Sequence, residues 1–184
     1  MKFFAIVLLM VLQLNAGSFL THAKPGITLG LSAKMVEGAV NLQLPQTISY
    51  MFFQIKLVKA QLRFPLKSQR IHTKLDTVIT METGLSEHRF DATVNLSSGI
   101  NYISSDDSVY LKDPNVESIV IKGVDPISSN YANGMITSAL ISYYHKYPAH
   151  RLSADEKSDL KFSIEKLVLK NGRLLVTLGE KNSL

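Results

Sequence analysis

Two long stretches of alternating apolar and polar residues constrain the fold of this chain more than any other feature. Apolar or threonine side chains occupy the odd positions of residues 71–81, and apolar side chains occupy the even positions of residues 90–102, where Ser98-Gly99 offers a bend. A period of two is typical of a strand with one buried face. Strands of this kind, some of them about 40 Å long, twist and must therefore coil. The sequence thus predicts a strongly curved antiparallel sheet.

A one-residue slip in the alternation supports the same prediction. The apolar positions are odd from Phe53 to Leu57 and even from Val58 to Leu66. An extra residue in an otherwise regular strand is the sequence signature of a β-bulge, which increases the local twist and bends the strand. We therefore expect a bulge, and with it a curled sheet, at this point of the chain.

Helical patterns precede and follow these strands. Ser32 can act as the N-cap of a short helix that ends near Pro45. Asp125-Pro126 provides the start of a longer helix that stops at Pro148, and its length of about 30 Å nearly matches the strands. The predicted fold class is therefore α+β. We expect a long, strongly curved antiparallel sheet wrapped around one long C-terminal helix, together with a short N-terminal helix.

Two glycines add local detail. Asn171-Gly172, between the apolar runs 162–170 and 173–179, is a strong signal for a β-hairpin. Gly134 in the middle of the longer helix costs about 1 kcal/mol of helix stability relative to Ala. We therefore expect a close contact or an opening beside Gly134, so that Gly134→Ala is tolerated and Gly134→Leu clashes with the sheet.

Residues 1–23 have the three-part pattern of a secretory leader. A lysine is followed by an apolar run over residues 3–12, and small residues allow cleavage after Ala16 or Ala23. The run is shorter than the roughly 20 apolar residues of a transmembrane helix, and an uncleaved N-terminal anchor is the alternative. We expect residues 24–184 to form a single domain of a periplasmic or secreted protein. Because the chain has no cysteine, it has neither disulfides nor a lipid-anchor cysteine.

No part of the sequence gathers the side chains that catalysis or metal binding requires. The five histidines stand apart, whereas a metal needs three or four convergent ligands. There is no nucleophile-elbow serine and no phosphate-binding glycine loop. The net charge of +5 comes from basic residues scattered singly along the strands, without the stacking aromatics of a nucleic-acid surface. We expect no enzyme, cofactor, metal or nucleic acid, and a hydrolase with dispersed catalytic residues is the enzymatic alternative.

From Leu31 to Gly179 the order of elements resembles the YceB-like lipoproteins, a domain-of-unknown-function family of bacterial cell envelopes. Residues 143–152, Tyr-Tyr-His-Lys-Tyr-Pro-Ala-His-Arg-Leu, are similar to the family's aromatic-x-x-x-Pro-x-Tyr-x-Leu segment after its long helix. The resemblance implies half of a tubular lipid-binding (TULIP) fold and a hydrophobic ligand. The chain departs from the family in two places, because the lipid-modified cysteine is absent and His150 replaces a tyrosine. Outer-membrane anchoring and any role of that tyrosine ring are therefore not carried over.

These observations together predict a protein that binds or carries a lipid or other apolar ligand outside the cytoplasm, in a tube between sheet and helix. The residues expected to line the ligand are Leu75, Ile79, Val94, Leu96, Met135, Ile136, Leu140 and Tyr143. We expect a monomer that makes transient contact with a membrane surface or an envelope protein. The alternative is a protein-interaction module with a dry, packed core, and a void well above one water molecule would favour the carrier.

Overall fold

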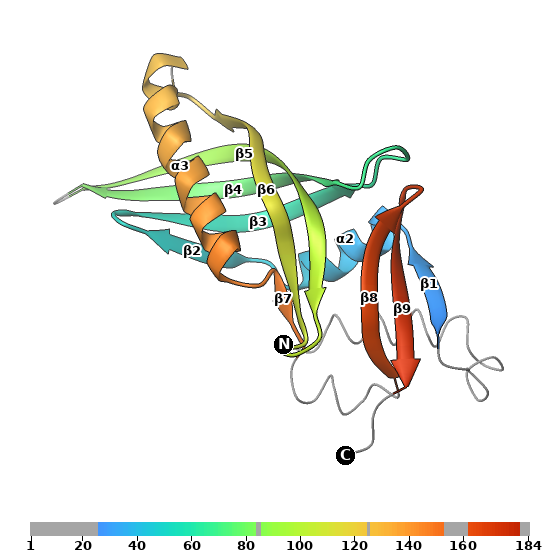
Figure 1. The fold of residues 1–184 in the computed structure, drawn as a ribbon. Helices are drawn as coiled ribbons and strands as arrows, with labels where there is room; N and C mark the ends of the chain where they lie inside the picture. Colours follow the sequence, from blue (N-terminus) through green and yellow to red (C-terminus); the bar gives the residue numbers. More distant parts are fainter. Residues whose placement is uncertain (1–25, 84–85, 125, 153–161, 181–184) are drawn as a thin grey trace.

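The computed structural model describes residues 26–83, 86–124, 126–152 and 162–180 (Figure 1). In chain order the elements are β1 (Ile27–Leu31), α2 (Ala33–Leu42), β2 (Gln46–Tyr50), β3 (Phe53–Arg63), β4 (Ile71–Thr83), β5 (Ser86–Ile103), β6 (Ser108–Ile121), α3 (Pro126–Lys146), β7 (His150–Arg151), β8 (Phe162–Lys170) and β9 (Arg173–Glu180). These strands form two antiparallel sheets, ordered β2-β3-β4-β5-β6-β7 and β1-β9-β8. The predicted leader, residues 1–23, lies outside the described residues.

The six strands β2 to β7 form one curled sheet, called the half-barrel from here on (Figure 1). β4 and β5 pair without interruption from Ile71–Ser98 to Thr83–Ser86. Leu75 and Ile79 on β4 and Val94 on β5 are buried, as the odd and even apolar phases predict. The alternation in these strands therefore marks the concave face of the half-barrel.

The predicted β-bulge is confirmed in β3. The pairing of β3 with β4 shifts between Leu57 and Lys59, and Val58 is exposed there. The shift keeps both Leu57 and Ala60 in the core although they stand on opposite phases of the strand. Two further shifts occur between β5 and β6, at residues 95/96 and 97/99. Since a bulge bends its strand and increases the local twist, these irregularities account for the curl of the sheet.

Helix α2 begins at the predicted N-cap, where the Ser32 hydroxyl accepts a hydrogen bond from the backbone of Met35. The helix also satisfies the part of β3 that β2 does not reach. The Asn41 amide bonds both the N–H and the C=O of Ala60, at 2.8 and 2.7 Å, and the Glu37 carboxylate accepts from the N–H of Leu62 at 2.8 Å. Backbone groups without a partner are costly when removed from water, so these two side chains stabilise the strand after its bulge.

The predicted fold class is wrong. The described residues are mostly β-sheet, in two sheets where one was expected, with two helices of 10 and 21 residues. β7, β8 and β9 follow α3 in the chain, so α3 is not a C-terminal helix. It lies across the open side of the half-barrel against β6 and β2, and the sheet does not wrap around it as in the expected TULIP-like half (Figure 1). Alternation reports which face of a strand is buried but not its pairing partners, and β1 pairs with the distant β9.

Local signals from the two glycines have different outcomes. The hairpin at Asn171-Gly172 is confirmed, since both residues have the positive φ angles, 52° and 68°, that a two-residue turn of this type requires. Gly134 is exposed, and a Cβ atom built on it meets nothing within 4 Å. Of the two alternatives expected at Gly134, the close contact is wrong and the open position is what the structure has, because the buried face of α3 runs through Ile136, Ala139 and Leu140. The predicted cap at Asp125 lies outside the described residues.

Candidate ligand-binding cavity

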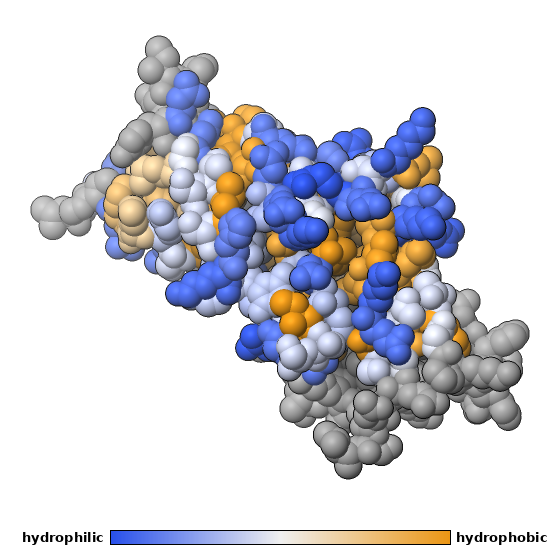
Figure 2. All heavy atoms as spheres, in the orientation of Figure 1, coloured by the Kyte–Doolittle hydropathy of each residue, from blue (hydrophilic) through white to orange (hydrophobic). Residues whose placement is uncertain are grey.

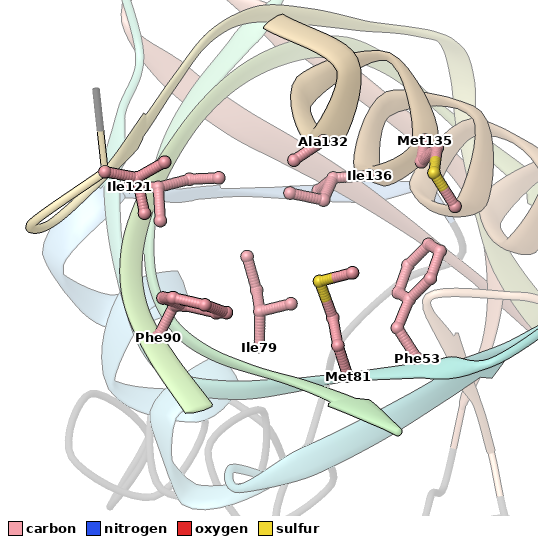
Figure 3. A pocket seen from close by; sticks show the side chains of 9 residues that line it. Phe53, Ile79, Met81, Phe90, Ile121, Ala132, Met135 and Ile136 are labelled. Atoms are coloured by element: carbon pink, nitrogen blue, oxygen red, sulfur yellow. The ribbon is translucent and has the colours of Figure 1, made fainter. Parts of the chain in front are cut away.

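A cavity of about 210 Å³ lies between α3 and the concave face of the half-barrel (Figure 3). All of its described lining residues are apolar: Phe53, Ile79, Met81, Phe90, Ile121, Val124, Ala132, Met135 and Ile136. In Figure 3 the side chains from the strands point toward those from the helix across the open space. The space is therefore an apolar hollow between two layers of the fold.

The register of the strands brings the sheet side of this cavity together. Phe53 on β3 pairs with Met81 on β4, and Ile79 pairs with Phe90 on β5. Residues that face each other across neighbouring strands share a face of the sheet, as do residues two apart along one strand. The four side chains therefore form one continuous apolar wall on the concave face.

The helix side of the cavity comes from one face of α3. Ala132, Met135 and Ile136 follow the i, i+3, i+4 spacing of residues that lie together on a helix. Ala132 lies opposite Phe90 and Ile79 in Figure 3, and its single methyl group cannot reach across the gap. The small side chain at this position therefore keeps the hollow open, while Met135 provides a flexible wall that can adapt to different shapes.

The cavity is closed on its inner side and reaches solvent on its outer side. Deeper in the half-barrel, Ile55, Val94 and Leu140 are buried and line neither this cavity nor the smaller one described below, so the hollow does not extend to them. Nearer the strand ends, Met81 and Phe90 are only half-buried although they line the cavity. A ligand can therefore enter from the end of the half-barrel where β3 and β5 begin and β4 ends.

A smaller cavity of about 140 Å³ lies toward the other end of the half-barrel and shares no lining residue with the first. α2, the later part of β3 and the first part of β6 contribute to its walls. Its lining is mixed, since Gln43, Gln46 and Ser98 accompany the apolar side chains. The Ser98 hydroxyl is buried and has no hydrogen-bond partner. This cavity is thus the smaller of the two, and its walls include polar side chains, which the described lining of the larger one lacks.

Five of the eight residues expected to line a ligand cavity do line one of the two. Ile79, Met135 and Ile136 come together at the larger cavity. Leu75 and Leu96 line the smaller one. Leu75 lies four residues before Ile79 on the same face of β4. The expected single tube between sheet and helix is therefore divided into two separate hollows.

The other three expected residues lie elsewhere in the half-barrel. Val94 and Leu140 are buried in the core cluster and line neither cavity. Tyr143 lies near the C-terminal end of α3, where its hydroxyl accepts a hydrogen bond from the Gln46 amide at 2.9 Å and its ring meets the Tyr144 ring edge-on. Tyr143 therefore fastens the helix to β2. Burial of its side chain raises the pKa of its hydroxyl above the usual value.

Sequence reasoning missed several residues of the larger cavity. Phe53, Met81 and Phe90 stand on the buried phase of their strands, so extending the expected lining to the strand ends would have found them. Ala132 carries no comparable signal. A small apolar residue on a buried helix face is as common beside tight packing as beside a hollow, and the difference depends on the side chains opposite.

A polar cluster lies at the turn between β5 and β6, and none of its side chains lines either cavity. The Tyr110 hydroxyl donates to Asp106 at 3.0 Å, and Arg151 on β7 approaches the same carboxylate at 3.5 Å. The Tyr102 hydroxyl donates to Asp107 at 2.8 Å, and burial followed by this hydrogen bond raises its pKa above the usual value. These contacts fasten β7 and the turn to the sheet.

Among the described residues no group of three or more histidines and carboxylates could hold a metal ion.

No helix in the described segments is long and apolar enough to span a membrane. A scan against protein-family models and a search of curated proteins both find no match to this chain. The resemblance of residues 143–152 to the YceB-like envelope lipoproteins stays a prediction, and the role of the cavity has to be inferred from its own shape and lining.

Proposed function

We propose that the protein binds one apolar ligand, an acyl chain or a hydrocarbon group of similar size, in the 210 Å³ cavity, without catalysis. The observation that supports this proposal is the lining, in which nine apolar side chains surround a space much larger than the voids of an ordinary core. An apolar cavity of about 150 Å³ is already large enough to bind benzene. The void also favours a carrier over the alternative of a protein-interaction module with a dry, packed core.

The energetics of the cavity favour a hydrocarbon occupant over water. Water in a cavity needs two to four polar partners, and the described side chains of the lining offer none. A closed void of 210 Å³ would cost on the order of 5 kcal/mol of stability. The cost is smaller here because one side is open. Filling the hollow still removes apolar surface from water at about 25 cal/mol per Å².

The volume also limits the kind of ligand. Sites for drug-sized molecules start at about 300 Å³, so this cavity holds one chain segment or one ring but not a whole phospholipid. A headgroup would remain outside, at the half-buried side chains of Met81 and Phe90. Met81 and Met135 are flexible and polarizable, which favours tolerance for several apolar ligands over strict selection of one.

The proposal includes a compartment. Residues 1–23 have the pattern of a secretory leader, so binding would take place in the periplasm or outside the cell, by a single domain acting as a monomer. Native mass spectrometry after gentle purification tests for a co-purifying apolar molecule. Titration with decanoate, followed by calorimetry, tests for uptake of a soluble acyl chain.

A matched pair of variants on α3 tests whether the ligand binds in the cavity. The ring introduced by Ala132→Phe is of benzene size and fills the hollow, so the affinity for decanoate should fall at least about tenfold. Ser142→Phe introduces the same side chain at an exposed position of the same helix and should leave the affinity unchanged. Uptake that is absent in the wild type, or equal in wild type and Ala132→Phe, would contradict the proposal.

A further inference from the structure

The turn between β2 and β3 exposes two large apolar side chains. Met51 is 79 % exposed and Phe52 is 45 % exposed. Figure 2 shows apolar surface gathered at this end of the half-barrel, where β2 and β3 meet beside the ends of β4 and β5. Residues 38–55 contain no charged side chain. Most of the Met51 side chain and nearly half of the Phe52 side chain face solvent, and exposed apolar side chains that lie together mark an interaction surface.

The turn is held in place by its neighbours. Met51 has a left-handed backbone conformation, with a φ angle of 51°, which residues other than glycine and asparagine rarely adopt. The N–H of Glu82 on β4 donates to the carbonyl of Phe52 at 3.0 Å. The rings of Tyr50 and Phe52 both contact the ring of Phe53, with centroids 5.6 and 5.8 Å apart. These contacts fix the turn and keep Met51 and Phe52 outside the core.

The exposed turn continues directly into the cavity wall. Phe53, which packs against Phe52, lines the cavity. Its strand partner Met81 also lines the cavity and is half-buried at the entrance. An apolar path therefore runs from the outermost side chain, Met51, through the aromatic cluster to the interior of the half-barrel.

We propose that the β2–β3 turn inserts into the surface of a lipid bilayer and so brings the cavity entrance against the acyl chains. This inference rests on the proposed function, because it makes the bilayer the source of the bound chain. A ligand apolar enough for the cavity is concentrated in bilayers, and a protein docked on the turn would cover the entrance instead of supplying it. Aromatic and apolar side chains, with a tyrosine beside them, are the residues found at membrane interfaces.

The charges near the turn indicate how it would bind. Glu82 and Glu87 pair across β4 and β5 at the same end of the half-barrel, so the positive excess of the chain does not lie there. Lys34, Lys59, Arg63 and Lys74 instead line a separate groove beside α2. Insertion through the turn should therefore depend on apolar transfer. It should persist on uncharged vesicles and at high salt, where attraction between charges is screened.

A tryptophan reporter tests this directly, because the chain contains no tryptophan. Phe52→Trp places the reporter at the turn, and Leu66→Trp places it beyond the opposite end of β3, at a position that is 75 % exposed. With phosphatidylcholine vesicles, the emission of Phe52→Trp should shift to the blue and be quenched by lipids with brominated acyl chains. Leu66→Trp should show neither effect. Both variants share the same N-terminus, so any binding through residues 1–25 affects them equally.

Two outcomes would overturn insertion through the turn. The first is an emission wavelength of Phe52→Trp that does not change when vesicles are added. The second is a change that requires anionic vesicles and disappears at high salt, which would indicate binding through the basic groove beside α2. In an otherwise unchanged chain, Met51→Ser should lower vesicle binding at least about tenfold, whereas Leu66→Ser should not. Neither serine variant should change the uptake of decanoate in solution. Conversely, Ala132→Phe should lose decanoate and keep insertion, so the failure of docking and the failure of ligand binding are distinguishable.

Discussion

The two sheets of this molecule use similar side chains and pack them differently. In the sheet β1-β9-β8 the inward residues Leu169, Val176 and Leu178 are 2–3 % exposed and line neither of the two cavities, whereas Leu174 beside the final hairpin borders the smaller one. In the half-barrel, residues as deeply buried as Ile79 border a hollow of about 210 Å³. Burial of single residues therefore does not distinguish a filled core from a hollow one. The difference lies in what stands opposite each side chain.

Curvature explains why the half-barrel is the hollow region. A curled sheet leaves more space over its concave face than one helix can fill along its whole length. In the C-terminal half of α3, Leu140 belongs to the same buried cluster as the fully buried Ala139 and Ile55, and none of the three lines a cavity. Ala132, about two helical turns before Ala139, lies on the same side of the helix, but there it borders the hollow. The hollow is therefore a consequence of one small residue at the wide end of the interior.

The largest expected effect comes from truncating one buried side chain in each of the two cores and comparing the loss of stability. Leu178 and Ile79 are both 3 % exposed, so truncation of each removes a similar amount of buried hydrocarbon. Leu178→Ala leaves a new void in a filled core and should cost about 3–5 kcal/mol of unfolding free energy, whereas Ile79→Ala enlarges an existing hollow and should cost about 2–3 kcal/mol. Denaturant unfolding of both variants measures the difference. Equal costs would mean that the region around Ile79 is packed as tightly as the three-stranded sheet.

The next effect comes from adding hydrocarbon at two positions of α3. Ala132→Leu extends into the hollow and should raise the unfolding free energy by about 1–2 kcal/mol, at roughly 0.8 kcal/mol per buried methylene. Ala139→Leu makes the same change at a fully buried position and should lower it by about 1–3 kcal/mol through overpacking. Thermal melts of the two variants should therefore move in opposite directions. Parallel shifts would remove the distinction between hollow and filled regions of the half-barrel.

The same comparison shows what the sequence could and could not predict. The alternation identified the buried faces of β3, β4 and β5, the slip located the bulge after Leu57, and Asn171-Gly172 located the final hairpin. These features depend on neighbours along the chain or across one turn. The pairing of β1 with β9 and the placement of α3 against both β2 and β6 depend on contacts between distant segments, which periodicity does not report. The cavity at Ala132 is missed for the same reason.

A smaller effect concerns the polar turn between β5 and β6, which borders the filled region. Burial, then the hydrogen bond to Asp107 and the charges of Asp107 and Asp106, raise the pKa of Tyr102. The unfolded chain loses this proton near pH 10 and the folded chain only at higher pH, so the stabilisation is complete below about pH 10 and is lost above it. Tyr102→Phe should cost about 1 kcal/mol at neutral pH and make the alkaline loss of stability shallower. Denaturant unfolding at neutral and alkaline pH measures both effects. An unchanged slope would assign the alkaline loss to other tyrosines, such as the partly buried Tyr144, whose pKa is also raised by burial.

The smallest effect is expected on the outer face of the helix whose inner face lines the cavity. Gly134 is exposed and a Cβ atom there meets nothing within 4 Å, so Gly134→Ala should stabilise α3 by up to about 1 kcal/mol. Gly134→Leu should also stabilise, because the position is exposed and the space around its Cβ atom is open. Gly99 on β5 is the control, since its added Cβ would lie 3.2 Å from the Cβ of Lys112, and Gly99→Ala should not stabilise. Thermal melts compare the variants with the wild type. If Gly134→Leu melted below the wild type, α3 would approach another surface on this side, and Gly134 would not be an open position.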